Sequence, residues 1–298
     1  MKNNLLFILN KNSGKVKKNL KLIYKAVDNF IDKEKFNVEL AETYRVEQIK
    51  NLIAKYKTLY NPIVVAVGGD GTVNKTINEI VNKNIILGII PLGSGNALAR
   101  ELKIPLNIND AVNVINNLNV KEIDLMRLNE MFYGACVGGV GFDALIAQKF
   151  ESLVNRGLKN YIRLSIKEFF KYKNIDILLK IEDKEFKHNA FLVSFANTSQ
   201  YGNNAFIAPK ARPDDGIIDI VVLKKLEIYN APGFAMKLFT KKVDTYRYLE
   251  YYRAKKFSIE GFSRKMYVHI DGEPINIENS TIKVELVTKA LKVIFLNH

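Results

Sequence analysis

The feature that most constrains this chain is a unit repeated in its first third: a short apolar segment, a glycine- or asparagine-rich loop, and an amphipathic helix. Residues 63–67 end in the loop GGDGT, and a helical pattern follows over residues 73–81. Residues 85–90 repeat the arrangement and end in PLGSGN. Alternating strands and helices predict a parallel sheet with helices on both faces, and such sheets bind ligands at the carboxyl ends of their strands.

From about residue 121 the pattern changes to short strands separated by turn signals, which predicts a mostly antiparallel sheet. The strand-like segments are residues 132–137, 175–181, 190–196, 217–223, 256–260, 265–270 and 281–285, and helical patterns interrupt them at about 144–172 and 231–253. We therefore expect an α/β fold. A Rossmann-like, parallel-sheet nucleotide domain at residues 1–126 would precede a mostly antiparallel β-sandwich domain with inserted helices at residues 127–298, whose last residues can pack back on the first domain.

The composition, 48% hydrophobic and 26% charged, is that of a globular chain and not of a disordered or fibrous one. The single cysteine, Cys136, excludes an internal disulfide framework. No stretch predicts a transmembrane helix or a signal peptide, so we expect a cytoplasmic protein. The net charge of +14 indicates an anionic partner, and nucleic acid, nucleotide phosphate and an acidic membrane face all qualify.

Three loops are expected to meet at one edge of the first sheet: NKNSGK at 10–15, GGDGTVN at 68–74 and PLGSGN at 91–96. Glycines let the backbone approach a phosphate, the helix that follows offers unpaired N–H groups, and the Ser94 hydroxyl adds a donor. Asp70 would repel phosphate, so we expect it to hold a metal ion or its water, or to orient a donor. For each loop alone, an ordinary glycine-rich turn is the alternative. A Walker A loop is excluded because its pattern does not occur.

Together with two later motifs, APKARPDDG at 208–216 and DGE at 271–273, these loops make the sequence similar to the diacylglycerol kinase catalytic family, specifically its soluble bacterial lipid kinases. The motifs occur in the expected order over nearly the whole chain. GGDGT by itself is shared with the NAD kinases and more distantly with the phosphofructokinases. PLGSGN combined with the late DGE narrows the choice to the lipid kinases.

The resemblance implies ATP and Mg²⁺ as cofactors. The residues that would contact ATP are Asn10, Ser13, Gly14, Thr43, Gly68, Gly69, Asp70, Gly71, Thr72, Val73, Asn74 and Ser94. Magnesium would be held by the Asp215 side chain and the carbonyl groups of Arg212 and Ile217. Glu273 would be the catalytic base, and the other catalytic candidates are Asp271, Asp70 and Asp124, the last in a water and metal network near the phosphates.

General chemistry supports a carboxylate in that role. Phosphoryl transfer to an alcohol needs in-line positioning, a cation on the phosphates and a group that accepts the hydroxyl proton. Glu273, in the second domain, fits the last requirement. Asp271-Gly272 is equally a strong signal for a plain hairpin turn, and residues 214–216 form a turn with or without a metal.

Two segments hold most of the positive charge. Residues 149–173 and 234–257 each contain seven Lys or Arg and two acidic residues, interleaved with apolar and aromatic side chains. This combination is typical of helices at an anionic membrane surface. The alternative for each segment is a solvated basic face on a helix whose aromatic side packs on the sheet.

We therefore expect an ATP- and magnesium-dependent lipid kinase, peripherally associated with the membrane, that phosphorylates a lipid alcohol, with diacylglycerol as the first candidate acceptor. Alternative acceptors are a polyprenol, a sphingoid base or phosphatidylglycerol. An NAD kinase-like enzyme and a nucleic-acid-binding nucleotide sensor are the alternatives from other classes, although no nucleic-acid partner is expected. The chain could act as a monomer or as a homodimer.

Overall fold

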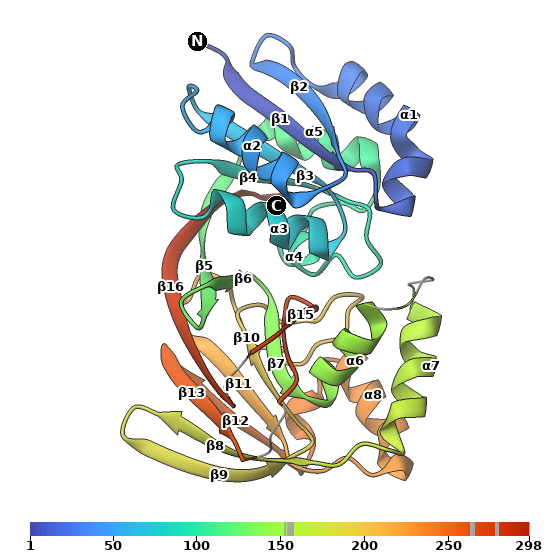
Figure 1. The fold of residues 1–298 in the computed structure, drawn as a ribbon. Helices are drawn as coiled ribbons and strands as arrows, with labels where there is room; N and C mark the ends of the chain where they lie inside the picture. The colour runs from blue at the N-terminus through green and yellow to red at the C-terminus, as the bar shows by residue number, and fades with distance from the viewer. Residues whose placement is uncertain (152, 154–157, 263–265, 278–279, 298) are drawn as a thin grey trace. The chain divides into compact units, whose positions relative to one another are not determined.

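The structure is a computed structural model that describes residues 1–298 except 152, 154–157, 263–265, 278–279 and 298 (Figure 1). The chain forms two compact units. The first comprises residues 1–123 and 288–298, and the second comprises residues 124–287. The C-terminal segment thus belongs to the first unit. Among the described residues, no helix is both long and apolar enough to cross a bilayer.

The first unit is built on a parallel sheet with the strand order β2-β1-β3-β4, extended by the end of β16. Its strands are β1 (Asn3–Asn10), β2 (Phe36–Thr43), β3 (Pro62–Gly68), β4 (Ile86–Pro91) and β16 (Thr281–Ile294). Residues 5–9 and 62–68 of the central strands are buried throughout, because helices cover both faces of a parallel sheet. The predicted parallel-sheet domain is confirmed.

Helices α1 and α5 pack together on one face of this sheet, and α2 and α3 cover the other (Figure 1). The helices are α1 (Gly14–Phe30), α2 (Val46–Tyr56), α3 (Asp70–Ile80), α4 (Ala97–Glu101) and α5 (Ile108–Asn117). In α1 the apolar side chains at Val16, Ile23 and Val27 recur at helical spacing and are buried, whereas the lysines between them are exposed.

The second unit contains two antiparallel sheets. One has the order β12-β11-β10-β7-β14-β15, and the other pairs β16 with β13, β8 and β9 and is joined by β5 and β6. Their strands are β5 (Val120–Leu128), β6 (Phe132–Gly134), β7 (Val137–Gly141), β8 (Ile175–Ile181), β9 (Lys184–Ala190), β10 (Leu192–Ala196), β11 (Ile218–Leu223), β12 (Leu249–Ala254), β13 (Lys256–Gly261), β14 (Val268–Ile270) and β15 (Glu273–Ile275). Their inward side chains, among them Phe195, Ile220 and Ile259, form one core, as the predicted β-sandwich requires.

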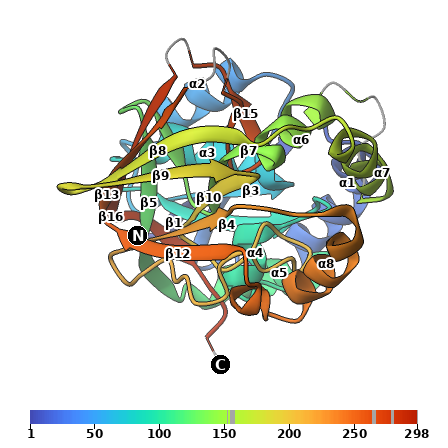
Figure 2. The same cartoon turned by 90° about the horizontal axis from the view of Figure 1, so that it is seen from below.

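Three helices gather on one side of the second unit in both views (Figures 1 and 2). They are α6 (Phe142–Glu151), α7 (Leu158–Phe169) and α8 (Ala231–Phe239), and the short helices η1 (Ile228–Asn230) and η2 (Val243–Thr245) flank α8. The pattern at 144–172 therefore corresponds to two helices, part of whose connection lies outside the described residues.

The expected helix over residues 231–253 is wrong in its second half. Helix α8 ends at Phe239, Lys241 adopts a left-handed φ of 60°, and residues 249–254 form strand β12, which pairs with β11. Aromatic residues favour strands, and pairing with the buried β11 outweighs the helical spacing that the sequence shows locally.

Candidate functional site

The three predicted phosphate loops follow neighbouring strands of the first sheet. Strands β1, β3 and β4 end at Asn10, Gly68 and Pro91, and the parallel register places Gly68 beside Pro91. The loops are in direct contact: a Cβ atom added to Gly69 would lie 2.9 Å from the Cα atom of Gly93. Only glycines allow two backbones to approach so closely.

Asp70 fastens the second loop to the third. One carboxylate oxygen accepts a hydrogen bond from the Asn96 N–H at 2.8 Å, and the other accepts one from the Ala97 N–H at 2.7 Å. These N–H groups lie at the beginning of α4, where a negative charge is favourable. The Asp70 carboxylate thus holds the backbone of the PLGSGN loop, and its role toward a metal ion or a bound phosphate stays a prediction.

The first loop is linked to both of the others. The Asn10 side-chain amide donates to Thr72 Oγ1 at 3.1 Å, and Lys15 Nζ donates to the Gly93 carbonyl at 3.0 Å. Ser13 and Gly69 precede helices α1 and α3 and make no side-chain capping bond. The two helix N-termini therefore bring positive ends of helix dipoles to the same edge of the sheet.

Lys15 is a site residue that the sequence analysis did not single out. Lys15 is exposed and its ammonium group donates to the Gly93 carbonyl, so it brings a positive charge to the glycine loops. The signal that could have identified it is a lysine in the first turn of the helix that follows the first loop. Lys11, by contrast, is held by Glu42 at 2.7 Å, and this hydrogen bond raises the pKa of Lys11.

The predicted nucleotide residues differ in exposure. Ser94 is exposed at the tip of its loop, whereas Thr72, Val73 and Asn74 are buried along α3. Thr43 is buried at the end of β2, and its hydroxyl donates to the Leu9 carbonyl at 3.5 Å. The site thus combines backbone and a few hydroxyl groups with very little free negative charge.

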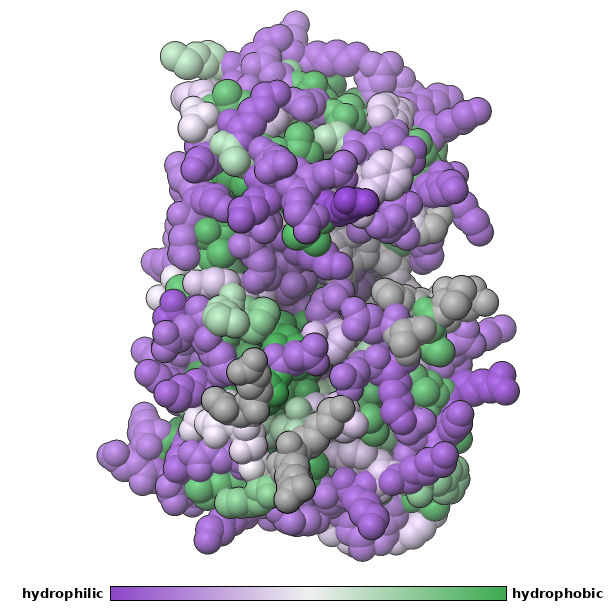
Figure 3. Space-filling model, in the orientation of Figure 1, coloured by the Kyte–Doolittle hydropathy of each residue, from purple (hydrophilic) through white to green (hydrophobic). Residues whose placement is uncertain are grey.

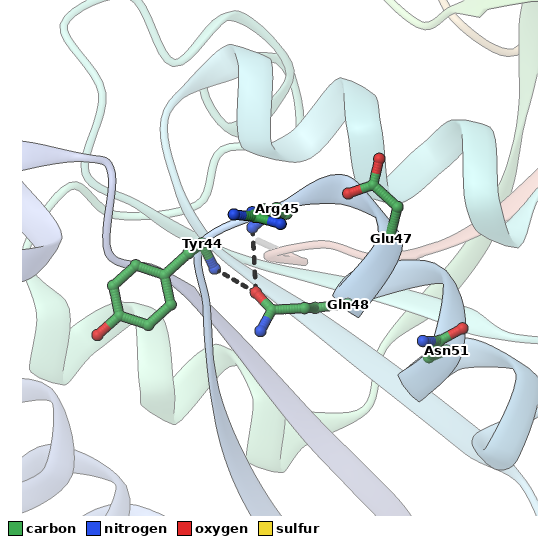
Figure 4. A pocket seen from close by; sticks show the side chains of 5 residues that line it. All are labelled: Tyr44, Arg45, Glu47, Gln48 and Asn51. Atoms are coloured by element: carbon green, nitrogen blue, oxygen red, sulfur yellow. Dashed lines mark hydrogen bonds between the residues drawn. The ribbon is translucent and has the colours of Figure 1, made fainter.

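A shallow hollow lies beside Thr43, and it is lined by Tyr44, Arg45, Glu47, Gln48 and Asn51 (Figure 4). The Gln48 side-chain oxygen accepts hydrogen bonds from the N–H groups of Tyr44 and Arg45 at 2.7 and 3.1 Å, which fixes this bend of the chain. The Tyr44 ring lies 5.6 Å from the Lys11 ammonium group. The hollow is therefore next to the first loop and on the β2 side of it.

In the second unit, Asp271-Gly272 forms a tight turn between β14 and β15, with Ile270 paired to Glu273. Both turn residues have positive φ, 51° and 81°, as a two-residue hairpin of type I′ requires. The hairpin interpretation is thus correct, and it places the half-buried Glu273 at the first position of β15.

Asp271 anchors this turn to a neighbouring strand. Its carboxylate accepts hydrogen bonds from the N–H groups of Ala135, Cys136 and Val137, at 2.9, 2.8 and 3.2 Å. Three backbone hydrogen bonds fix the position of this carboxylate. The geometry of Asp271 is that of an anchor for the neighbouring residue Glu273.

Asp124 and the turn at residues 212–217 form a third cluster. Asp124 Oδ2 accepts a hydrogen bond from the Gly216 N–H at 2.9 Å, and the Asp124 N–H donates to the Pro213 carbonyl at 2.7 Å. Asp215 accepts from the Ile217 N–H at 3.3 Å and from Arg253 Nη2 at 2.7 Å. The predicted residues Asp124, Asp215 and Ile217 are thus brought together.

Arg253 adds positive charge to this cluster. Its Nε lies 3.1 Å from Asp219 Oδ1, and burial raises the pKa of Asp219 although Arg253 acts in the opposite direction. Over the residues that the structure describes, no three His, Cys, Asp or Glu side chains converge in a way that could hold a metal. A cation at this turn would need backbone carbonyl groups and water to complete its coordination.

Two family models match the chain. The model described as the diacylglycerol kinase catalytic domain matches residues 4–128, and the one described as the YegS C-terminal NAD kinase beta sandwich-like domain matches residues 136–295. The chain is 27% identical over 271 residues to a diacylglycerol kinase of Staphylococcus saprophyticus, with 87% of each chain covered. It is 26% identical over 239 residues to one of Staphylococcus epidermidis, covering 76% of this chain and 74% of the relative.

Solved structures show the same fold. A crystal structure of a diacylglycerol kinase from Bacillus anthracis has a TM-score of 0.74 at 19% identity, and covers 99% of this chain and 97% of its own. An NAD kinase from Archaeoglobus fulgidus has a TM-score of 0.51 at 15% identity, with 99% and 93% covered. The NAD kinase-like combination of a parallel α/β unit and a β-sandwich is therefore established for this chain.

Proposed function

Because the chain belongs to the diacylglycerol kinase catalytic domain family, a family of phosphotransferases, we propose that it transfers the γ-phosphoryl group of ATP to the hydroxyl group of a membrane lipid alcohol. Diacylglycerol is the first candidate acceptor, with phosphatidic acid as the product. The observation that carries the donor half of the proposal is the backbone contact between the Gly69 and Gly93 loops, with Lys15 beside it.

We assign the phosphates of ATP to the ends of β3 and β4, where the two glycine loops meet. The sheet order β2-β1-β3-β4 then places the first loop next to them and Thr43 farthest away. A nucleotide laid along this edge would put its base in the hollow lined by Tyr44 and Gln48 (Figure 4). This hollow offers one aromatic face and amide groups, which suit a purine.

Magnesium is the cation that we propose for the turn at residues 212–217. Mg²⁺ in proteins takes one or two carboxylates and retains several waters, and Asp215 with the carbonyl groups of Arg212 and Ile217 fits this requirement. Bound there, it would supply the kind of positive charge that phosphoryl transfer requires. Arg253 competes for the Asp215 carboxylate, so Arg253→Gln should tighten Mn²⁺ binding measured by calorimetry, and Asp215→Asn should weaken it. Equal affinity in both variants and the wild type would argue against this site.

Glu273 is our candidate for the general base that accepts the proton of the acceptor hydroxyl. It is half-buried, it follows a rigid turn, and the preceding Asp271 is already occupied by three backbone N–H groups. Asp271 is thus committed to backbone groups, and Glu273 is the carboxylate of this turn that we assign to the substrate. Glu273→Gln should abolish transfer while nucleotide binding persists. Wild-type turnover in that variant would exclude Glu273 as the base.

We propose that α7 and the turn that follows it, residues 170–171, form the surface that contacts the acceptor membrane. Ile162, Ile166 and Phe170 are 49%, 55% and 70% exposed and recur every fourth residue, so they form one apolar stripe. Arg163, Lys167 and Lys171 are exposed and recur with the same spacing, which places a basic stripe alongside it. An apolar stripe flanked by lysine and arginine is the pattern of a helix at an anionic lipid surface.

The second basic segment, residues 234–257, shows exposed apolar and basic side chains together only in its first part. Met236 and Phe239 on α8 are 68% and 53% exposed, close to the exposed Lys241 and Lys242. Its remainder is strand β12, whose Tyr251 and Tyr252 are only partly exposed and belong to the sheet. The space-filling view shows apolar and hydrophilic side chains intermixed over this side of the second unit (Figure 3). We therefore restrict the proposed membrane contact to α7 and the α8 region.

The decisive experiment incubates the purified protein with radiolabelled ATP, Mg²⁺ and mixed vesicles that carry one lipid alcohol at a time. Diacylglycerol, a polyprenol, a sphingoid base and phosphatidylglycerol form the panel. We expect labelled phosphatidic acid from diacylglycerol. Labelling of another lipid alone would change the acceptor but not the enzyme class. Labelling of NAD alone would favour the NAD kinase alternative that the shared fold keeps open, and no labelling of any acceptor would refute the proposal.

A further inference from the structure

A buried polar network in the second unit lies behind the hairpin that carries Glu273. At its centre is Asp143, the second residue of α6, which is 8% exposed. Asp143 Oδ2 accepts hydrogen bonds from the hydroxyl groups of Ser194 and Tyr201, both at 3.0 Å, and lies 3.3 Å from His269 Nε2. Burial, reinforced by the charge of Asp143, raises the pKa of Tyr201, so this hydroxyl keeps its proton and donates it.

The imidazole of His269 extends the network to the turn. The Gly272 N–H donates to His269 Nδ1 at 3.3 Å, so Nδ1 is the acceptor and the ring proton is on Nε2, facing Asp143. An unbroken chain of hydrogen bonds thus runs from the Asp143 carboxylate through the ring to the backbone of Gly272. The next residue is Glu273.

The hairpin needs such external support. Strands β14 and β15 have three residues each, and hairpins this short are barely stable alone. Two contacts tie its turn to the rest of the unit. The Asp271 carboxylate accepts hydrogen bonds from the N–H groups of residues 135–137, and His269, which accepts from the Gly272 N–H within the hairpin, lies against Asp143 of α6. Helix α6, which carries Asp143, also packs against β14 and β15.

Gly139, in β7, leaves the space that the Asp143 carboxylate and the His269 imidazole occupy. A Cβ atom on Gly139 would lie 2.5 Å from Asp143 Oδ2, 3.1 Å from His269 Nε2 and 3.0 Å from the Val193 carbonyl oxygen. Any side chain at residue 139 would therefore separate the carboxylate from the imidazole. Gly139 is therefore required by the network. A position inside a strand does not by itself need a glycine.

We propose that Asp143 and His269 are positioning residues that hold the Asp271-Gly272 turn so that the Glu273 carboxylate faces the acceptor hydroxyl. This inference rests on the proposed role of Glu273 as the base. Neither Asp143 nor His269 takes part directly in proton transfer in this proposal, because both are buried and bonded to other groups.

Two substitutions of His269 distinguish the role of Nδ1 from the role of Nε2. His269→Asn places an amide oxygen near the position of Nδ1 and keeps an acceptor for the Gly272 N–H, whereas His269→Gln places its amide near Nε2 and keeps only the link to Asp143. We expect H269Q to lower kcat about tenfold or more and H269N to lower it less, because only H269N retains the contact that holds the turn. The KM for ATP should stay within about twofold in both variants, since the nucleotide loops belong to the first unit.

A double-mutant cycle identifies the route of the effect. If His269 acts through Glu273, H269Q should cost several-fold less in the Glu273→Gln background than in the wild type. Equal losses in both backgrounds, or equal kcat in H269Q, H269N and the wild type, would overturn the positioning role. The melting temperatures of H269Q and H269N should be measured alongside. A merely structural role of His269 would lower the melting temperature of both variants and leave their kcat values equal to each other.

Gly139→Ala keeps the inference testable if H269Q does not fold, because it alters no side chain of the network and acts only by crowding Asp143 and His269. It should lower kcat in the same way as H269Q. The proposed base fails separately: if Glu273→Gln alone has wild-type turnover, the role of Glu273 is wrong whatever the His269 variants do.

Discussion

The Cα atom of Gly69 lies 2.6 Å from the position that a Cβ atom on Gly93 would occupy. The obstacle is backbone on both sides, so it cannot be relieved by a change of side-chain rotamer. Two loops that are 24 positions apart in the chain are thereby locked together at the edge where we place the phosphates.

Gly93→Ala should weaken ATP binding. The added methyl group must push the two loops apart, and overpacking of this kind costs about 1–3 kcal/mol, which corresponds to about 5- to 150-fold in the Kd of ATP if the cost falls on binding. Calorimetric titration with a non-hydrolysable ATP analogue measures the change. Gly233→Ala is a matched control, because a Cβ atom there meets nothing within 4 Å. Unchanged affinity in Gly93→Ala would place the phosphates elsewhere.

Asp70→Ala should lower both stability and nucleotide affinity. It leaves the N–H groups of Asn96 and Ala97 without their acceptor, which costs about 1–3 kcal/mol. Asp70→Asn retains one acceptor oxygen and should fall between the wild type and the alanine variant. Urea unfolding followed by circular dichroism measures the stability. If the asparagine variant is as stable as the wild type but has no activity, the carboxylate acts on the substrate or a metal and not on the loop.

Neutralising the basic stripe of α7 should release the protein from anionic vesicles. Each lysine near such a surface contributes about 1 kcal/mol, so Lys167→Gln with Lys171→Gln should weaken binding about thirtyfold. Lys21→Gln with Lys25→Gln on α1 removes the same charge from another exposed face and serves as the control. Vesicle sedimentation at two salt concentrations measures the affinity. An equal loss in both pairs would indicate a general charge effect with no docking helix.

Negative charge introduced on the apolar stripe tests the other component of docking. Ile166→Glu with Phe170→Glu should weaken vesicle binding even at high salt, where the electrostatic component is screened. Both side chains are more than half exposed, so the melting temperature should change little. Activity on a short-chain, water-soluble acceptor should persist, because the substitutions lie outside the residues that we assign to the nucleotide and the base. Unaltered binding to vesicles would remove α7 from the membrane contact.

His188 should make stability depend on pH in mildly acidic solution. Burial lowers the pKa of His188 below its ordinary value of 6.5, partly offset by Glu250. The unfolded chain therefore takes up the proton at a higher pH than the folded one, and the stabilisation present above pH 6.5 is lost as pH falls through the lowered folded pKa. His188→Gln should flatten the dependence of the urea midpoint on pH in that window. An identical dependence in the variant would contradict the assignment.

Much of the site that we propose for the phosphates of ATP was predictable from local sequence. The carboxyl ends of parallel strands share one edge of a sheet, so the strand–loop–helix pattern around Gly68 and Gly93 was enough to bring the loops together. Asp271-Gly272 was likewise predictable as a turn, because few residue pairs accept positive φ at both positions. The expected helix beyond Phe239 failed because the pairing of β12 with β11 is a contact between distant segments, which local spacing does not report.

The sequence by itself determined the order of the elements, the glycine loops and the turn before Glu273, because each depends on backbone preferences of neighbouring residues. Tertiary structure alone decided what the polar side chains do. Asp70 caps a helix 27 residues away, Asp271 holds a strand about 135 residues away, and Asp143 meets His269 across 126 residues. A side-chain hydrogen bond has no signature in local periodicity, since its partner is chosen by how the strands and helices pack.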